Sequence, residues 1–543
     1  MSDTVLRLDN LAIALPTGAD RTLAVSGIDL ELRTGEVTCL IGESGSGKSL
    51  VARAILGLLP APHVRVAAGR ILFEGADLVC AEPAAMRTIR GAKIAMIFQE
   101  PMTALNPLHT IGRQIDEVLR IHTDLPRAAR RARVVALLES VNLPEPMRML
   151  RSFPHQLSGG QRQWAMIAMA LALEPRLLIA DEPTTALDVT TQAQILQLIR
   201  DLQRERGTAV LFITHDFGVV ADIADSVAVL RKGELVEQGR AATVLGRPRH
   251  PYTKALIAAV PKLEVPPAGP VNSAPFILQA RDVKKIYGAR SLFGGSRTRA
   301  LDRVSIELRR GETLGLVGES GSGKSTLARA LTGLMTVDDG EILLSGLDIA
   351  RMTRRQLRPI RKRVQMVFQD PYGSLDPRQR VMDIIAEGPI IHGTDPALAR
   401  REASEMLALV GLDPSAAHRF AHEFSGGQRQ RIGIARALAS EPRLILGDEP
   451  VSALDVSVQA QVLALLADIK SRLQLSMLFV THDLRVALQV CDRIAVMRQG
   501  EVVEVAPTAA IFRNPQHPYT KALFTAVPGA HWQDLLAQAG AVA

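Results

Sequence analysis

The sequence GESGSGKS occupies residues 42–49 and recurs letter for letter at residues 318–325. Each copy follows an apolar run of strand length and has the GxxxxGK[ST] spacing of a phosphate-binding loop. Its glycines let backbone N–H groups turn toward phosphate oxygens, the lysine reaches the phosphates, and the last hydroxyl ligates Mg²⁺. Because two copies occur in the same context, the probability that both are chance glycine turns is negligible. The nucleotide-binding residues predicted here are Gly42, Ser44, Gly45, Gly47, Lys48, Ser49 and Leu50, and Gly318, Ser320, Gly321, Gly323, Lys324, Ser325 and Thr326.

Further repeats follow in the same order in both halves. The pairs are SGGQRQ at 158–163 and 425–430, DEP at 181–183 and 448–450, THD at 214–216 and 481–483, and HPYTKAL at 250–256 and 517–523. A repeat this long indicates duplicated domains rather than a solenoid of small units. We predict one domain at 1–260 and a second at 276–543, joined by a proline-rich linker at 261–275.

The composition agrees with two globular domains. The chain has 543 residues, 47% hydrophobic and 22% charged, too many for one compact core. Only 3% are aromatic, which argues against a stacking surface for single-stranded nucleic acid. The three cysteines have no zinc or iron–sulfur spacing, so no such cluster is expected. The first ten residues do not have the basic-then-apolar pattern of a leader, so no secretion signal is expected. No apolar run approaches the roughly 20 residues that span a bilayer.

Short apolar runs alternate with helical patterns within each half. Runs at 37–41, 177–180 and 210–214, and at 314–317, 444–447 and 478–481, precede the motifs. Continuous apolar runs of this length predict buried parallel strands in an α/β core. Residues 130–141 and 398–410 have helical periodicity instead. Each half is therefore predicted to be an α/β core with an inserted helical subdomain.

Acidic residues and a histidine end the predicted strands. Asp181 and Asp448 are placed to hold the Mg²⁺ shell, and the next residues, Glu182 and Glu449, to polarise an attacking water. A solvated pair of carboxylates at a strand end is the alternative interpretation. His215 and His482 end a further strand. A lone histidine there is more often structural, but with the other motifs each one suits a γ-phosphate contact, and Glu182, Glu449, His215 and His482 form the predicted catalytic set.

The chain resembles the nucleotide-binding subunits of ATP-binding-cassette (ABC) transporters. LSGGQ at 157–161 and FSGGQ at 424–428 look like that family's signature motif, and Gln99 and Gln369 match its glutamine loop. The resemblance implies two P-loop domains with RecA-like cores, Mg²⁺–ATP as cofactor, and two composite ATP sites in which each signature completes the opposite half. It adds as nucleotide contacts Ser158, Gly160, Gln161, Ser425, Gly427 and Gln428, with Gln99 and Gln369. The implied metal set is Ser49, Gln99, Asp181, Ser325, Gln369 and Asp448.

The two halves differ at two positions of interest. The aromatic residue that stacks on adenine in this family matches Tyr287, whereas the first half offers only Leu15. Adenine contact in the first site is therefore expected to be weaker. Trp164, near the first signature, stands where Arg431 stands in the second half.

A narrower resemblance is to the oligopeptide/dipeptide permease group. It rests on QEPMTALNP at 99–107, QDPYGSLDP at 369–377 and the two HPYTKAL segments. It implies ATP-driven import of peptides, or of glutathione, peptide antibiotics or nickel. The implied partners are two transmembrane permease subunits and an external solute-binding protein. The chain would then lie peripherally on the cytoplasmic face of the bacterial inner membrane.

Two other function classes compete with an importer. A soluble twin-cassette ATPase of translation usually has a long charged helical linker, and the DNA-repair relatives carry zinc cysteines, so we expect no nucleic-acid partner. An exporter usually fuses membrane spans to its cassette. The arginine clusters at 127–133 and 354–363 are explained by a solvated face, with anionic headgroups as the alternative.

Overall fold

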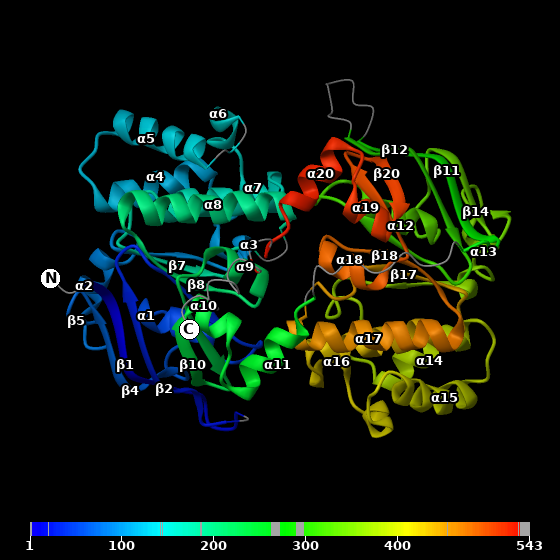
Figure 1. Ribbon diagram of the computed structural model, residues 1–543, viewed down its shortest axis with the longest axis horizontal. Helices are drawn as coiled ribbons and strands as arrows, with labels where there is room; N and C mark the ends of the chain where they lie inside the picture. Colours follow the sequence, from blue (N-terminus) through cyan, green and yellow to red (C-terminus); the bar gives the residue numbers. More distant parts are fainter. Residues whose placement is uncertain are drawn as a thin grey trace. The chain divides into compact units, whose positions relative to one another are not determined.

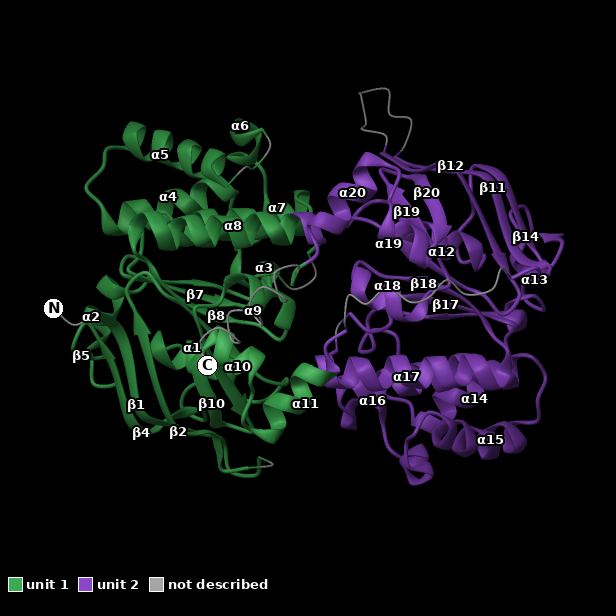
Figure 2. Ribbon diagram, in the orientation of Figure 1, with its two compact units in different colours: residues 1–187, 191–258, 528–543 green, residues 188–190, 259–527 purple. Residues whose placement is uncertain are grey.

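The computed structural model divides into two compact units, coloured separately in Figure 2. Unit 1 holds residues 1–187, 191–258 and 528–543, and unit 2 holds residues 188–190 and 259–527. The residues whose structure is described are 3–19, 21–141, 143, 145–184, 187–261, 272–288, 298–452, 454–529 and 532. Residues 262–271 of the predicted linker lie outside them, so the linker remains a proposal.

A six-stranded sheet forms the centre of unit 1, in the order β10-β9-β3-β8-β7-β6. Its strands β7, β8 and β10 are labelled in Figure 1. From β9 to β6 the neighbours are parallel, and β10 is antiparallel to β9. Every residue of β3, β7 and β8 is buried, as their continuous apolar sequences predict. The strands are β3 (Val37–Ile41), β6 (Ile94–Ile97), β7 (Leu177–Asp181), β8 (Ala209–Ile213), β9 (Ser226–Arg231) and β10 (Glu234–Arg240).

A second sheet of unit 1 is antiparallel. Its order is β2-β1-β4-β5, with β1 (Thr4–Ala14), β2 (Leu23–Arg33), β4 (Arg65–Phe73) and β5 (Ala76–Asp77). Leu6, Leu8 and Ile13 of β1 are buried in one core with Val51 and Ile55 of the helix that follows the phosphate loop. This core fixes that helix against both sheets.

The helices of unit 1 connect the strands and form the predicted helical insertion. They are α1 (Lys48–Ile55), α2 (Pro83–Ile89), α3 (Pro101–Ala104), α4 (Ile111–His122), α5 (Arg127–Ser140), α6 (Pro146–Met149), η1 (Pro154–Gln156), α7 (Gly159–Ala170), α8 (Val189–Arg206), α9 (Phe217–Ile223), α10 (Ala241–Gly246) and α11 (Pro251–Ala259). Between β6 and β7 the described residues form helices and turns only, which confirms the helical insertion.

Unit 2 repeats this architecture. Its sheets have the orders β16-β17-β18-β13-β19-β20 and β12-β11-β14-β15. The strands are β11 (Phe276–Tyr287), β12 (Thr298–Arg309), β13 (Thr313–Val317), β14 (Asp339–Leu344), β15 (Leu347–Asp348), β16 (Val364–Val367), β17 (Leu444–Asp448), β18 (Ser476–Val480), β19 (Arg493–Arg498) and β20 (Glu501–Pro507). The helices are α12 (Lys324–Leu331), α13 (Arg354–Leu357), η2 (Arg361–Arg363), α14 (Val381–Ile391), α15 (Pro396–Leu409), η3 (Pro414–His418), η4 (Ala421–Glu423), α16 (Gly426–Leu438), α17 (Val456–Leu473), α18 (Leu484–Val490), α19 (Thr508–Arg513) and α20 (Pro518–Thr525).

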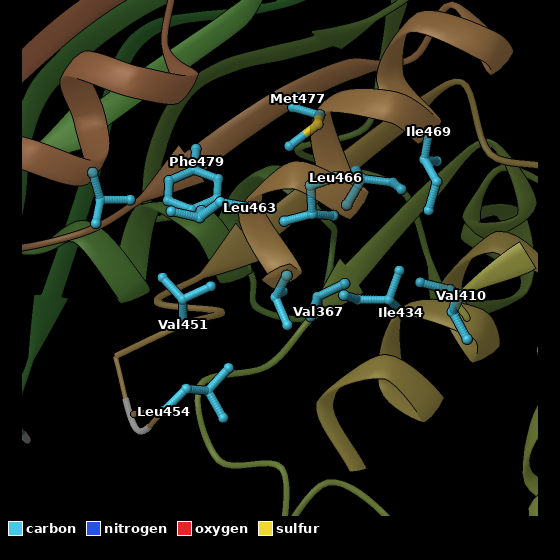
Figure 3. Packing of buried hydrophobic residues seen from close by; sticks show 14 of the residues in the cluster. Val367, Val410, Ile434, Val451, Leu454, Leu463, Leu466, Ile469, Met477 and Phe479 are labelled. Carbon is cyan, nitrogen blue, oxygen red and sulfur yellow. The ribbon is translucent and has the colours of Figure 1, made fainter. Parts of the chain in front are cut away.

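One hydrophobic cluster joins the helical insertion of unit 2 to its central sheet (Figure 3). Val367 of β16 and Phe479 of β18 share it with Ile434 of α16 and Leu466 of α17. The helix that begins at the second SGGQ motif is therefore anchored directly on strands of the α/β core. Within the part of the chain that the structure describes, no helix is both long and apolar enough to cross a membrane.

Candidate functional site

The backbone of each phosphate-binding loop requires glycine at its first position. Gly42 has a φ of 152° and Gly318 a φ of 150°. A Cβ atom on Gly42 would lie 2.2 Å from the Leu230 carbonyl oxygen, and one on Gly318 would lie 2.2 Å from that of Met497. No other residue fits so close an approach. The loops therefore pack tightly on the ends of β9 and β19, and each leads into a helix that starts at its lysine.

The two loop lysines are buried and directed into their own loops. Lys48 Nζ donates to the carbonyl oxygens of Gly42 at 2.7 Å and Glu43 at 2.9 Å. Lys324 makes the equivalent bonds to Gly318 at 2.8 Å and Glu319 at 2.7 Å. Burial lowers the pKa of Lys324 although carboxylates nearby oppose that change. An anion bound in either loop would be a stronger hydrogen-bond acceptor for the lysine of that loop than the backbone carbonyl oxygens are.

A hydroxyl and a carboxylate meet beside each loop. Ser49 Oγ donates to Asp181 Oδ1 at 2.9 Å, and Ser325 Oγ donates to Asp448 Oδ1 at 2.9 Å. Burial raises the pKa of Asp181 and of Asp448, because the charged form loses its hydration. Hydroxyl and carboxylate oxygens are ligands of the kind that Mg²⁺ takes. The residues present therefore fit the predicted metal position.

Glu182 lies at the centre of a polar cluster in the first site. Gln99 Nε2 donates to Glu182 Oε2 at 2.9 Å, and His215 Nδ1 lies 3.3 Å from Glu182 Oε1. The Glu182 side chain is 14% exposed. Its backbone φ is 48°, which is left-handed, and Glu449 has the same value. The glutamine, glutamate and histidine predicted from separate motifs thus meet in one place.

The second site has the same arrangement. Gln369 Nε2 donates to Glu449 Oε2 at 2.9 Å, and His482 Nδ1 lies 3.1 Å from the same oxygen. Burial by itself would raise the pKa of Glu449, but the hydrogen bond with His482 holds it below its ordinary value. Burial opposes the charged form of His482, yet Glu449 raises the pKa of that ring. The carboxylate is therefore kept ionised, as a base that polarises water must be.

The SGGQ motifs build the N-termini of α7 and α16. Ser158 Oγ accepts from Gln161 N–H at 3.2 Å, and Gln161 Oε1 accepts from Ser158 N–H at 3.0 Å. Ser425 and Gln428 form the same capping box at 3.4 and 3.1 Å. This pairing uses the serine and glutamine side chains to cap the helix. We predicted both as nucleotide contacts and missed the capping role, although the S-x-x-Q spacing signals it.

The second glycine of each signature faces a neighbouring helix. A Cβ on Gly427 would lie 2.3 Å from Val458 Cγ1, whereas one on Gly160 would lie 3.8 Å from Thr191 Cγ2. A side chain at Gly427 would therefore push the signature helix away from α17. The exposed first turn of each helix keeps the backbone N–H groups and the dipole that favour an anion.

The two halves differ in structure at the position that was predicted to contact adenine. Tyr287 pairs with Thr298 at the end of β11, and Leu15 N–H donates to Thr22 O at the matching place after β1. Tyr287 is 45% exposed, while Leu15 packs partly buried on the core. Sequence reasoning missed Arg21, whose Nη2 donates to Gly45 O at 2.5 Å. It is a cation held over the first loop.

The remaining predicted residues also lie at these loops. Ser44 and Ser320 are loop residues, Gly321 has a φ of 80°, and Leu50 and Thr326 lie in the first turns of α1 and α12.

Trp164 is buried in α7, while the Arg431 guanidinium in α16 donates to Val410 O at 3.1 Å and Gln461 Oε1 at 2.9 Å. The two insertions are thus stabilised differently at this position.

Comparison with known proteins identifies the family. The ABC transporter model matches residues 25–185 and 301–452, more than half of the chain. The chain belongs to the ABC transporter family. A model of the oligopeptide/dipeptide transporter C-terminal region matches residues 236–282 and 503–542. The chain is thus a repeated ABC cassette of the oligopeptide/dipeptide group, and it binds and hydrolyses ATP.

Curated ABC proteins resemble the chain over nearly its whole length. The peptidoglycan transport ATP-binding protein YejF of Agrobacterium fabrum is 49% identical over 529 residues, covering 96% of each chain. The glutathione import ATP-binding protein GsiA of Salmonella typhimurium is 46% identical, covering 97% of this chain and 90% of its own. A solved dimeric bacterial ABC transporter cassette aligns with 44% of this chain and 98% of its own, at 30% identity and a TM-score of 0.40.

Proposed function

We propose that this chain is the ATP-hydrolysing subunit of an importer for peptides or peptide-like solutes, with two catalytically competent ATP sites. The observation that carries this proposal is the duplication of the entire lysine, serine–aspartate and glutamine–glutamate–histidine arrangement, with each copy followed by an oligopeptide/dipeptide transporter C-terminal region. The names of the relatives add two solutes, peptidoglycan and glutathione, that contain amide-linked amino acids.

Each proposed role follows from the contacts of the first site. Lys48 would transfer its hydrogen bonds from the loop carbonyls to nucleotide phosphates. Ser49 and Asp181 would hold Mg²⁺, which neutralises charge on the phosphates. Glu182 would polarise the attacking water, and His215 would orient that carboxylate while reaching toward the γ-phosphate. The second site would work in the same way.

We further propose that each ATP site is composite. Neither loop has a second set of backbone donors for the far side of a γ-phosphate in its own sequence motif, whereas each signature helix begins with a capped turn of N–H groups. Ser158 and Gly160 would therefore complete the site of Lys324, and Ser425 and Gly427 would complete the site of Lys48.

The segments at 101–107 and 371–377 are the proposed contacts with two transmembrane permease subunits. Large apolar side chains are exposed here: Met102 is 48% exposed, Tyr372 59%, and Leu108 at the segment's edge 81%. Each segment follows a glutamine that contacts the catalytic glutamate. Nucleotide-dependent changes at the glutamate could thus reach the membrane subunits. This arrangement would place the chain on the cytoplasmic face of the bacterial inner membrane, with an external solute-binding protein completing the importer.

A paired charge substitution tests the membrane contact. We expect Met102→Glu with Tyr372→Glu to abolish solute uptake while basal ATPase activity survives, because burying two carboxylates at an apolar interface is unfavourable. Ile121→Glu is the matched control, since Ile121 is 64% exposed but lies at the end of α4, outside both segments. Uptake and co-purification with the permease that withstood the paired change would contradict the proposed contact.

The solute class is tested by uptake in a strain that lacks this chain. Labelled tripeptides, glutathione, peptidoglycan-derived peptides and nickel are compared with and without the restored gene. We expect restored uptake of at least one peptide-like compound and no change for nickel. A defect confined to nickel would overturn the solute assignment.

A further inference from the structure

The HPYTKAL segments at 250–256 and 517–523 bring a tyrosine hydroxyl onto each phosphate-binding loop. The Glu43 N–H donates to Tyr252 Oη at 3.2 Å, and the Glu319 N–H donates to Tyr519 Oη at 3.2 Å. The tyrosines follow their loops by about two hundred residues in the chain, with separations of 209 and 200. The same long-range contact in both halves is therefore a built feature of the fold.

Each tyrosine is fixed at the start of a helix by a carboxylate and a histidine. The His250 N–H donates to Glu237 Oε2 at 3.1 Å, and the Tyr252 N–H donates to His250 Nδ1 at 3.2 Å. Glu504 and His517 repeat these contacts at 3.0 and 3.1 Å in the second half. The backbone beside each tyrosine is thus tied to β10 or β20.

An arginine from the central sheet covers each tyrosine ring. The Arg231 guanidinium carbon lies 5.0 Å from the ring centre of Tyr252, and that of Arg498 lies 4.9 Å from that of Tyr519. Arg231 directly follows Leu230, whose carbonyl crowds Gly42. Burial raises the pKa of both phenols to about 12, so each hydroxyl is neutral near pH 7. In each half the tyrosine ring, the end of the central sheet and the phosphate-binding loop therefore lie next to one another.

The hydroxyl holds the same peptide unit that the loop lysine holds. The peptide between Gly42 and Glu43 offers its carbonyl to Lys48 at 2.7 Å and its N–H to Tyr252 at 3.2 Å. When Lys48 turns to a phosphate, the carbonyl loses that bond. The tyrosine hydroxyl then remains to stop the peptide from rotating and to keep its N–H directed away from the phosphates.

We propose that Tyr252 and Tyr519 are positioning residues, through which the C-terminal segment of each half preorganises the phosphate-binding loop for ATP. The proposal rests on the assignment of residues 42–49 and 318–325 as the ATP-binding loops. Each tyrosine acts on the loop of its own half only, and it acts on nucleotide binding rather than on the hydrolytic step.

Nucleotide titration of single-site variants of the full chain tests the proposal. Lys324→Ala removes the second site, so that a fluorescent ATP analogue reports the Lys48 site alone. In this background we expect Tyr252→Phe to raise the dissociation constant about 3- to 10-fold, which is the loss expected when the Glu43 N–H loses its hydrogen bond to the hydroxyl. Tyr519→Phe in the same background is the matched control and should leave the constant unchanged. The Lys48→Ala background should reverse the two results.

Phenylalanine keeps the ring and its contact with the arginine, so the melting temperature should change little. In ATPase assays the KM for ATP should rise while kcat stays within about twofold, a split that a merely structural role would not produce. An unchanged dissociation constant for Tyr252→Phe, or equal effects of the two tyrosines in one background, would overturn the positioning role. If Lys48→Ala with Lys324→Ala still bound the analogue, the loop assignment itself would be wrong.

Discussion

Glu182→Gln and Glu449→Gln each remove one negative charge and keep the length of the side chain. Both carboxylates accept a hydrogen bond from a glutamine at 2.9 Å. In the first site the new amide can keep its oxygen for that bond and turn its NH₂ toward His215, whose Nδ1 lies 3.3 Å from the other carboxylate oxygen. In the second site the amide oxygen can take the place of the single carboxylate oxygen that contacts both Gln369 and His482, the latter at 3.1 Å. We therefore expect the fold and ATP binding to survive both changes.

The expected loss follows from the geometry of the carboxylate. A positioned general base contributes about 10²- to 10⁴-fold to a rate, which corresponds to roughly 3 to 5 kcal/mol of transition-state stabilisation. Both glutamate side chains are only 14% exposed, so bulk water has little access to replace the missing base. Because the proposal requires both sites in each cycle, we expect each variant to lower kcat by about 10³-fold in the assembled transporter.

Steady-state phosphate release by the assembled transporter measures this loss, and a fluorescent ATP analogue measures binding to the same preparation. Asp225→Asn is the control, because Asp225 is an exposed carboxylate at the opposite ends of the strands, where it accepts from Val37 N–H at 2.8 Å. Full hydrolysis by either glutamine variant would refute the claim that both sites are catalytically competent. Loss of binding together with hydrolysis would refute the argument that the amide is accommodated.

Three further predictions concern site composition, nucleotide contact and packing. In the double glutamine background, Lys48→Ala with Ser425→Arg should leave one retained ATP per chain, and Lys48→Ala with Ser158→Arg should leave none; equal retention would contradict composite sites. Leu15→Tyr should tighten ATP binding to the first site by about 1 kcal/mol through ring stacking, measured by titration with the second site disabled, and unaltered affinity would count against the adenine position. Phe479→Ala should lower the free energy of unfolding by about 3 to 5 kcal/mol, because Phe479 is fully buried in the cluster of Figure 3, and a denaturation midpoint like that of the parent would contradict this packing.

The central fold was predictable because its signals are local. The buried strands β3, β7 and β8 are short and nearly all of their residues are apolar. A motif follows the apolar run of each strand directly. Parallel strands bring their carboxyl ends to one edge of a sheet. Ser49 and Asp181 therefore meet although they are 132 positions apart.

Other contacts depend on side-chain direction and on packing between distant segments. The antiparallel sheet containing β1 and β2 was not foreseen, since its alternating exposure gives a weaker pattern than a buried strand. The hydrogen bonds of Glu182 with Gln99 and of Glu43 with Tyr252 join residues 83 and 209 positions apart. No local propensity encodes such pairs. The capping box of Ser158 is a local feature, which the S-x-x-Q spacing of Ser158 and Gln161 indicates.

The left-handed backbone at Glu182 and Glu449 lowers the stability of the fold at the two positions where the proposed hydrolysis needs a carboxylate. A residue with a Cβ atom in this conformation costs about 1 to 2 kcal/mol relative to a relaxed one, and glycine would relieve that cost. The substitution that is most favourable for the backbone is thus the one that deletes the carboxylate. Selection for thermal stability alone would tend to remove the carboxylates proposed to be catalytic, and an engineer who seeks a more heat-resistant protein should leave these two turns unaltered.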